Sequence, residues 1–549
     1  MYKHSALSRL AGCIVLTACG GGGGSDGENI TPAPPTPAAP TVIELLDSNP
    51  DADTANVAHY RAGFSLSHTG QSGTSYDLNI TCSGGSGFTI ERDSIDITST
   101  TQLLEHRFSC PDRLEANSSY EMTAETTVSN EDFEGLASFT SGETTPGLNV
   151  LAQTQTGREE VESLFDNYIV GGLIDELDLP PLLEQLLISV IVDLASSQWQ
   201  NLANPEVIHG VTVQRVEYAS ISPDGMEAAN LSGLIAFPDD PDAVKRDQVI
   251  LLNHATGSTP SDFNSSDAWH IIAHLFAGRG YLVIAPDNYG RGSTVNSPET
   301  YLLAGRTGAN AVDLVQRVLE DESYNAYYFN EVSPAPIIII GYSQGGHSAI
   351  ASWLEIAHHH ETSLLVDAVY AGGAPFDLYR TFRGVLQTVN NTCGGDGFCN
   401  LVDPEVLIPF ASNRILPGLI TYTDSGVVMS DLIDGEDLRP TFVEGFLDDN
   451  TDFDNLRALL QLNSFTNISN PAAVFASTVA NLYHSPYDRL VPVDNTLTLA
   501  NTLGGNAIHH FDQCDSSGFR LIFETTDKVG VIHTLCGLDT LDAVFAELR

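Results

Sequence analysis

A strand that runs directly into a glycine-rich turn and a helix lies in the middle of this 549-residue chain. Residues 336–340 are a proline followed by four isoleucines, a β-branched run typical of a strand buried on both faces of a parallel sheet. The turn that follows, residues 341–347, reads Gly-Tyr-Ser-Gln-Gly-Gly-His, and helical apolar spacing continues to residue 356. Glycines at both second neighbours of Ser343 let strand and helix approach closely, so the turn can hold this serine strained and exposed. Ser343 is therefore a candidate nucleophile.

The charge of the chain excludes one class of partner. Lys and Arg total 23 against 71 Asp and Glu, which gives a formal net charge of −48. A surface this acidic repels phosphate backbones, so we expect no nucleic acid partner. The hydrophobic content of 42% is ordinary for a globular protein with a large core.

The N-terminus has the pattern of a signal peptide, residues 1–18. Lys3 and Arg9 supply a positive start, and the apolar stretch at 10–17 is too short to span a bilayer. Residues 16–19, Leu-Thr-Ala-Cys, resemble the lipobox of bacterial lipoproteins. The resemblance implies a lipid on Cys19, a membrane anchor through that lipid, and an extracytoplasmic location at the cell envelope. Gly20 at the next position implies the outer membrane, and an ordinary cleaved signal peptide is the alternative.

Six cysteines remain once Cys13 and Cys19 are set aside, and an even number outside the cytoplasm indicates disulfides. Six cysteines allow fifteen pairings, of which we favour the one that joins neighbours in the sequence. None of the pairs has the CxxC spacing of zinc or redox sites, so we expect no metal site. The favoured pairs are Cys82 with Cys110, Cys393 with Cys399, and Cys514 with Cys536.

Composition divides the region before residue 150 into a tether and a small domain. Residues 19–41 contain a glycine run and then a Pro/Ala-rich stretch, which predicts a flexible and then extended tether. Residues 42–146 contain short alternating runs separated by Gly, Ser and Asp turns, enough for about seven strands of an immunoglobulin-like sandwich. Residues 114–120 resemble the tyrosine corner of fibronectin type III domains. The prediction is a small all-β domain, a spacer or a binding module.

Residues 151–549 are predicted to form an α/β domain. Apolar spacing predicts helices over 151–205, and from residue 211 strands and helices alternate, which is typical of a mostly parallel sheet. A segment of roughly a hundred residues, about 377–477, interrupts this alternation. Strands are expected at 211–218, 231–237, 248–253, 281–285, 336–340, 366–370, 479–483 and, last, 519–524.

Two side chains downstream could activate the serine, because a hydroxyl needs a base and the base needs an anionic partner. Asp488 lies in a turn just past a predicted strand. Its nearest rival is Asp494, and a helix cap is the structural alternative. His533 lies in a predicted loop between the last strand and the terminal helix, whereas His509 and His510 precede that strand. We therefore predict His533 as the base and Asp488 as its partner.

The negative charge that develops on a carbonyl oxygen needs two preorganised donors. The backbone N–H of Gln344, the residue after the candidate nucleophile, is the first candidate. Residues 254–257, His-Ala-Thr-Gly, resemble the His-Gly-x loop of esterases, which makes the N–H of Thr256 the second. Asp287 and His347 are expected to be structural, in a turn and on a helix face.

Three stretches together, residues 253–257, 280–287 and 341–346, resemble α/β-hydrolases of the secretory lipase type, over residues 205–549. The resemblance implies an α/β-hydrolase fold, a helical lid at 377–477, and hydrolysis of carboxylic esters through an acyl-enzyme without metal or cofactor. It also implies a substrate with an apolar acyl group. Two alternatives are a serine peptidase of the prolyl-oligopeptidase type and a non-catalytic adhesin built on the hydrolase fold.

Overall fold

The computed structural model describes most of the chain after residue 146. Before that point it describes the backbone of strands β1–β7, which lie between residues 40 and 140. From 147 to 548 it describes every residue except 171–191, 224–227, 241–245, 265–266, 329–334, 360–363, 400–403, 424, 436, 467, 469–470, 476–477, 515–518 and 521–530. The predicted signal peptide, residues 1–18, and nearly all of the predicted tether at 19–41 therefore lie outside the described residues.

Strands β1–β7 form two antiparallel sheets, ordered β1-β2-β5 and β4-β3-β6-β7. Their assignment to an immunoglobulin or fibronectin III-like sandwich stays a prediction. Their bounds are β1 Pro40–Leu46, β2 Arg61–His68, β3 Thr74–Gly84, β4 Ser94–Ile97, β5 Phe108–Ser109, β6 Ser119–Val128 and β7 Glu131–Thr140.

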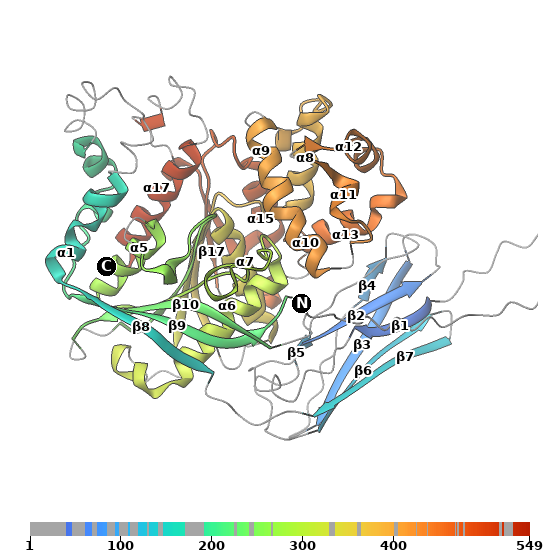
Figure 1. Ribbon diagram of the computed structural model, residues 1–549, viewed down its shortest axis with the longest axis horizontal. Helices are drawn as coiled ribbons and strands as arrows, with labels where there is room; N and C mark the ends of the chain where they lie inside the picture. Colours follow the sequence, from blue (N-terminus) through green and yellow to red (C-terminus); the bar gives the residue numbers. More distant parts are fainter. Residues whose placement is uncertain are drawn as a thin grey trace, which may run out of the picture.

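A nine-stranded sheet with the order β18-β17-β14-β13-β11-β12-β10-β9-β8 forms the centre of the rest of the chain (Figure 1). The six strands from β12 to β18 are parallel, and β8, β9 and β10 are antiparallel at one edge. The predicted mostly parallel α/β fold is confirmed. The bounds are β8 Leu148–Thr156, β9 Val211–Ile221, β10 Ala228–Pro238, β11 Val249–Asn253, β12 Leu282–Pro286, β13 Pro336–Tyr342, β14 Leu365–Gly372, β17 Ala480–Tyr483 and β18 Ala507–His510.

Helices cover both faces of this sheet because its central strands are apolar on both sides. In β13, Ile338 and Ile340 belong to the core on one face, while Ile337 and Ile339 belong to the core on the other. The first core includes side chains of α1 Arg158–Leu164, α5 Ala268–Gly278 and α17 Val531–Glu547. The second includes side chains of α6 Ala304–Glu320, α7 Gln344–His359 and α15 Asp494–Leu503.

The interruption expected at 377–477 is a mostly helical insertion between β14 and β17, drawn in orange in Figure 1. It has an apolar core of its own, which also takes in residues 301–303 from the loop after β12. Its elements are α8 Leu378–Val389, α9 Pro404–Phe410, α10 Leu416–Tyr422, α11 Met429–Leu432, β15 Ile433–Asp434, β16 Asp437–Leu438, α12 Pro440–Leu447, α13 Asp454–Leu462 and α14 Pro471–Val474.

One sequence-based assignment was wrong. Residues 148–156, mostly within the expected helical region, form the edge strand β8, whose side chains are almost all exposed. Most of the expected last strand, 519–524, lies outside the described residues, and among the described strands the sheet ends at β18, Ala507–His510, which was not predicted. Phe519 is helical, and its buried ring stacks on Trp199 with 5.0 Å between the ring centroids.

Candidate active site

Ser343 lies in the tight turn between β13 and α7, at the carboxyl edge of the sheet. Its φ is +57°, a left-handed conformation that is strained for a residue with a side chain. A Cβ at Gly341 would collide with the carbonyl of Gly345, and a Cβ at Gly345 would collide with the carbonyl of Asn253. Glycine is therefore required at both second neighbours by the close approach of strand, helix and the loop after β11.

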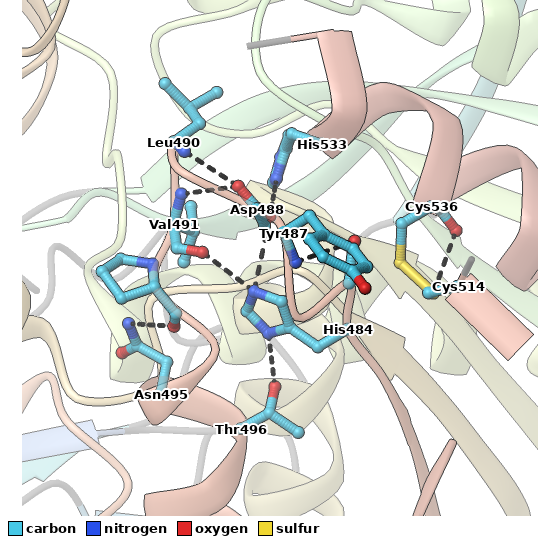
Figure 2. Close-up of polar contacts among 12 residues, drawn as sticks. His484, Tyr487, Asp488, Leu490, Val491, Asn495, Thr496, Cys514, His533 and Cys536 are labelled. Atoms are coloured by element: carbon cyan, nitrogen blue, oxygen red, sulfur yellow. Dashed lines mark hydrogen bonds and ion pairs between the residues drawn. A yellow bond between two sulfur atoms is a disulfide. The ribbon is translucent and has the colours of Figure 1, made fainter. Parts of the chain in front are cut away.

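Asp488 follows β17 and is 1% exposed. Its Oδ1 accepts hydrogen bonds from the backbone N–H groups of Leu490 at 2.8 Å and Val491 at 3.0 Å. Its Oδ2 lies 2.6 Å from Nδ1 of His533 (Figure 2). Burial by itself raises the pKa of this carboxyl, but His533 and His484 beside it outweigh burial and hold the pKa well below its usual range. Asp488 is therefore ionised at neutral pH.

His533 lies in the first turn of α17, not in the loop that the sequence suggested, and it is 5% exposed. Because a carboxylate can only accept, Nδ1 of His533 carries the hydrogen and donates it to Asp488. Among the residues that the structure describes, Nε2 has no hydrogen-bond partner. In the neutral imidazole this nitrogen then has a free lone pair, which is the arrangement of a general base.

The histidine lies next to the serine turn through Tyr342, the residue before Ser343. The Tyr342 hydroxyl donates to the carbonyl of His533 at 2.7 Å, and the two ring centroids are 5.1 Å apart. No hydrogen bond joins Ser343 to His533 among the described residues. The structure thus pairs Asp488 with His533 and brings His533 beside the turn of Ser343, without closing the last contact.

A second histidine, His484, also contacts the carboxylate of Asp488. His484 ends up fully buried directly after β17, with Nε2 3.4 Å from Oδ2 of Asp488 and 2.9 Å from the carbonyl of Val491. Its Nδ1 lies 2.7 Å from the Thr496 hydroxyl. Figure 2 shows His484 and His533 approaching the same carboxylate. In the sequence, the only signal for His484 is its position four residues before Asp488.

The two predicted oxyanion donors lie on neighbouring segments. Gln344 is the first residue of α7, where backbone N–H groups have no partner within the helix. The loop after β11 that contains Thr256 packs against the same turn, since a Cβ on Gly345 would also approach the His254 carbonyl at 2.8 Å. The Thr256 hydroxyl lies 2.8 Å from that of Tyr301. Both donors remain predictions as to role.

Glu299, which sequence reasoning missed, joins this site to the insertion. Its Oε1 accepts from the Gln344 side chain at 2.6 Å, and its Oε2 accepts from Arg291 at 3.1 Å and from Arg414 at 2.9 Å. Burial raises the pKa of Glu299, but Arg291 and Gln344 outweigh it and the pKa is lowered. Glu299 belongs to no sequence motif. A charged residue in a loop usually faces solvent, so its position gave no reason to place it at the site.

Four of the six paired cysteines form the expected disulfides, Cys393–Cys399 in the insertion and Cys514–Cys536. Cys536 lies one turn after His533 on α17, so the second disulfide ties the start of this helix to the segment after β18 (Figure 2). Cys19 and Cys110 lie outside the described residues, as does the side chain of Cys82.

Other polar residues near the site have structural contacts. Asp287 is 1% exposed and accepts hydrogen bonds from the hydroxyls of Ser232 and Ser261. His347 is fully buried, its Nε2 lies 2.9 Å from the Asn463 carbonyl, and burial lowers its pKa to about 4. Within the described residues, no cluster of His, Cys, Asp and Glu could hold a metal ion, and no helix is long and apolar enough to cross a bilayer.

Comparison with known proteins supports the fold of this part of the chain. Residues 249–517 match the model of the alpha/beta hydrolase family. The match covers just under half of the chain. The match includes Ser343 and Asp488 and ends before His533. A search of the curated proteins found no match.

Solved structures with detectable likeness are distant. A candidate hydrolase of Legionella pneumophila is 18% identical over 71% of this chain and 97% of its own, with a TM-score of 0.44. The rice cell wall degrading esterase LipA of Xanthomonas oryzae is 16% identical over 70% and 97%, with a TM-score of 0.44. Candida antarctica lipase A is 14% identical over 55% and 71%, with a TM-score of 0.34.

Proposed function

We propose that this protein is a serine carboxylic ester hydrolase that works through an acyl-enzyme. The observation that supports it most is the hydrogen bond from Nδ1 of His533 to the buried carboxylate of Asp488, with Nε2 unpartnered beside the turn of Ser343. A serine in a strained turn and a histidine oriented by an anion are the parts that acyl transfer needs.

In the proposed reaction, the Ser343 hydroxyl oxygen attacks the ester carbonyl while Nε2 of His533 takes its proton. The N–H groups of Gln344 and Thr256 hold the oxyanion of the tetrahedral intermediate. The intermediate collapses as the imidazolium returns the proton to the leaving alcohol, which leaves an acyl group on Ser343. A water molecule, deprotonated by His533, then releases the acid. The imidazolium that forms in each half is stabilised by the ionised Asp488.

We further propose that the enzyme is anchored at the bacterial outer membrane through lipid on Cys19, as its lipobox-like sequence implies. The segment 19–41 would then act as a tether that places the ester hydrolase domain away from the membrane. The apolar acyl pocket implied by the lipase resemblance stays a prediction.

Replacing Ser343 with Ala tests the nucleophile. Ser343→Ala should reduce turnover of p-nitrophenyl butyrate to the uncatalysed rate, while far-UV circular dichroism and the melting temperature stay close to those of the wild type. The substitution also removes no packing contact from the core, because Ser343 is partly exposed. Ester turnover that persists in this variant at the wild-type rate would refute the assignment.

A further inference from the structure

A cavity of about 660 Å³ lies at the carboxyl edge of the sheet, next to the proposed reaction centre. It is formed by the loops that follow β11 and β12 and by Asn413 and Arg414 of the insertion. One sequence neighbour and one contact place it beside the centre. Gly257, in its lining, directly follows Thr256, and Glu299, also in its lining, holds the side chain of Gln344.

One cluster in the lining of this cavity has an excess of positive charge. Two guanidinium groups, those of Arg291 and Arg414, share the single carboxylate of Glu299. That carboxylate is 8% exposed, and its other oxygen accepts a hydrogen bond from the Gln344 side chain. One more positive charge than negative charge is therefore held together, in a chain whose formal net charge is −48.

Arg414 also has donors to spare. Only its Nη1 has a partner in the part of the chain that the structure describes, so Nε and Nη2 are left for another acceptor. Its side chain is 35% exposed, and that of Arg291 is 15% exposed. The other acidic residue in the lining, Asp262, is 53% exposed and lies 3.7 Å from Arg215, so it faces water and a cation of its own.

We propose that this cavity binds an anionic group of the substrate, a carboxylate attached to the ester, with Arg414 as the main specificity residue and Arg291 beside it. The inference rests on the proposed ester hydrolysis and names its substrate class. A planar guanidinium with two free N–H donors matches a carboxylate, and such charge-assisted hydrogen bonds are strong where water is partly excluded. A neutral acyl chain would leave these donors without a partner.

The test compares charged and neutral esters at one ionic strength. One pair, the p-nitrophenyl monoester of glutarate and p-nitrophenyl valerate, has the carboxylate on the acyl part. A second pair, 4-acetoxybenzoate and its methyl ester, has it on the alcohol part. We expect the wild type to favour the charged ester in one pair, by the ratio of kcat/KM, and this pair then identifies which part of the ester occupies the cavity.

Arg414→Gln should lower that ratio about tenfold, the effect of losing one hydrogen-bonded charge pair. Arg414→Lys should restore part of it, because the charge returns without the planar geometry. Arg439→Gln is the matched control, since Arg439 belongs to the insertion, is 40% exposed and does not line the cavity, and it should leave the ratio unchanged. A wild type that favours the neutral ester in both pairs, or a ratio unaffected by Arg414→Gln, would overturn the proposal. If no ester is hydrolysed at all, the proposed function itself is wrong.

Discussion

The two oxygens of Asp488 have separate tasks, and this division determines what a substitution will do. Oδ1 accepts from two backbone N–H groups, and Oδ2 accepts from His533. In an asparagine at this position the carbonyl oxygen would keep the backbone contacts, so its NH₂ would face His533. Nδ1 of His533 would then have to accept a hydrogen bond, so the hydrogen of the neutral ring would move to Nε2. With a hydrogen on Nε2, the imidazole could not take the proton of Ser343.

We therefore predict that Asp488→Asn lowers kcat for p-nitrophenyl butyrate by about 10³- to 10⁴-fold while KM changes little. Asp494→Asn is the matched control, because Asp494 was the rival acid in the sequence and begins α15 instead of contacting His533. A variant Asp488→Asn that keeps most of the wild-type kcat, or an Asp494→Asn that loses it, would reverse the assignment of the acid.

At the residue scale, the sequence predicted what local pattern can encode. The isoleucine run predicted a buried strand, and the glycines around Ser343 predicted a tight turn. Asp488 was recognisable by its position after a predicted strand. Glu299 could not be found this way. Its role depends on Gln344, 45 positions away, and on Arg414, 115 positions away, and no local pattern predicts such contacts.

Among the elements, those with strong periodicity were predicted and those at the edges were not. The strand β8 was not predicted because almost all of its side chains face solvent, so its sequence does not alternate between apolar and polar residues. The helix α17 was placed too late in the sequence, so that His533 was assigned to a loop. This helix is buried on most of its sides, with residues such as Leu535 and Leu538 in the core. It therefore lacks the amphipathic pattern that would mark its first residue in the sequence.

The disulfide Cys514–Cys536 is predicted to stabilise both the fold and the position of the helix α17. It closes a loop of 22 residues and ties down the first turns of α17, which hold His533. Replacing both cysteines with serine should lower the free energy of unfolding by about 2–4 kcal/mol. It should also lower kcat, because the imidazole loses part of its support.

The double serine variant of Cys393 and Cys399 is the control for that experiment, since this disulfide closes a small loop within the insertion. It should affect kcat less than the variant of Cys514 and Cys536. Urea unfolding followed by fluorescence and steady-state ester hydrolysis provide the two measurements. Equal losses of kcat in both variants would show that the disulfide next to His533 has no specific part in holding the base.

On the scale of the whole molecule, the insertion and the sheet meet at one ionic cluster. Arg414 comes from the insertion, Arg291 from the loop after β12, and Gln344 from the start of α7, and all three converge on Glu299. The insertion is therefore connected to the residue that follows the proposed nucleophile. This arrangement lets one segment determine both the shape of the cavity and the support of the proposed oxyanion donor.

Covalent labelling by a fluorophosphonate tests the central claim most directly, because only a serine activated by a base reacts readily with this phosphorus electrophile. Intact-protein mass spectrometry of the wild type should show one adduct, and peptide mapping should place it on Ser343. The same treatment should leave Ser343→Ala and His533→Ala unmodified. An adduct on another residue, or wild-type protein that stays unlabelled under conditions that label a known serine esterase, would contradict the account.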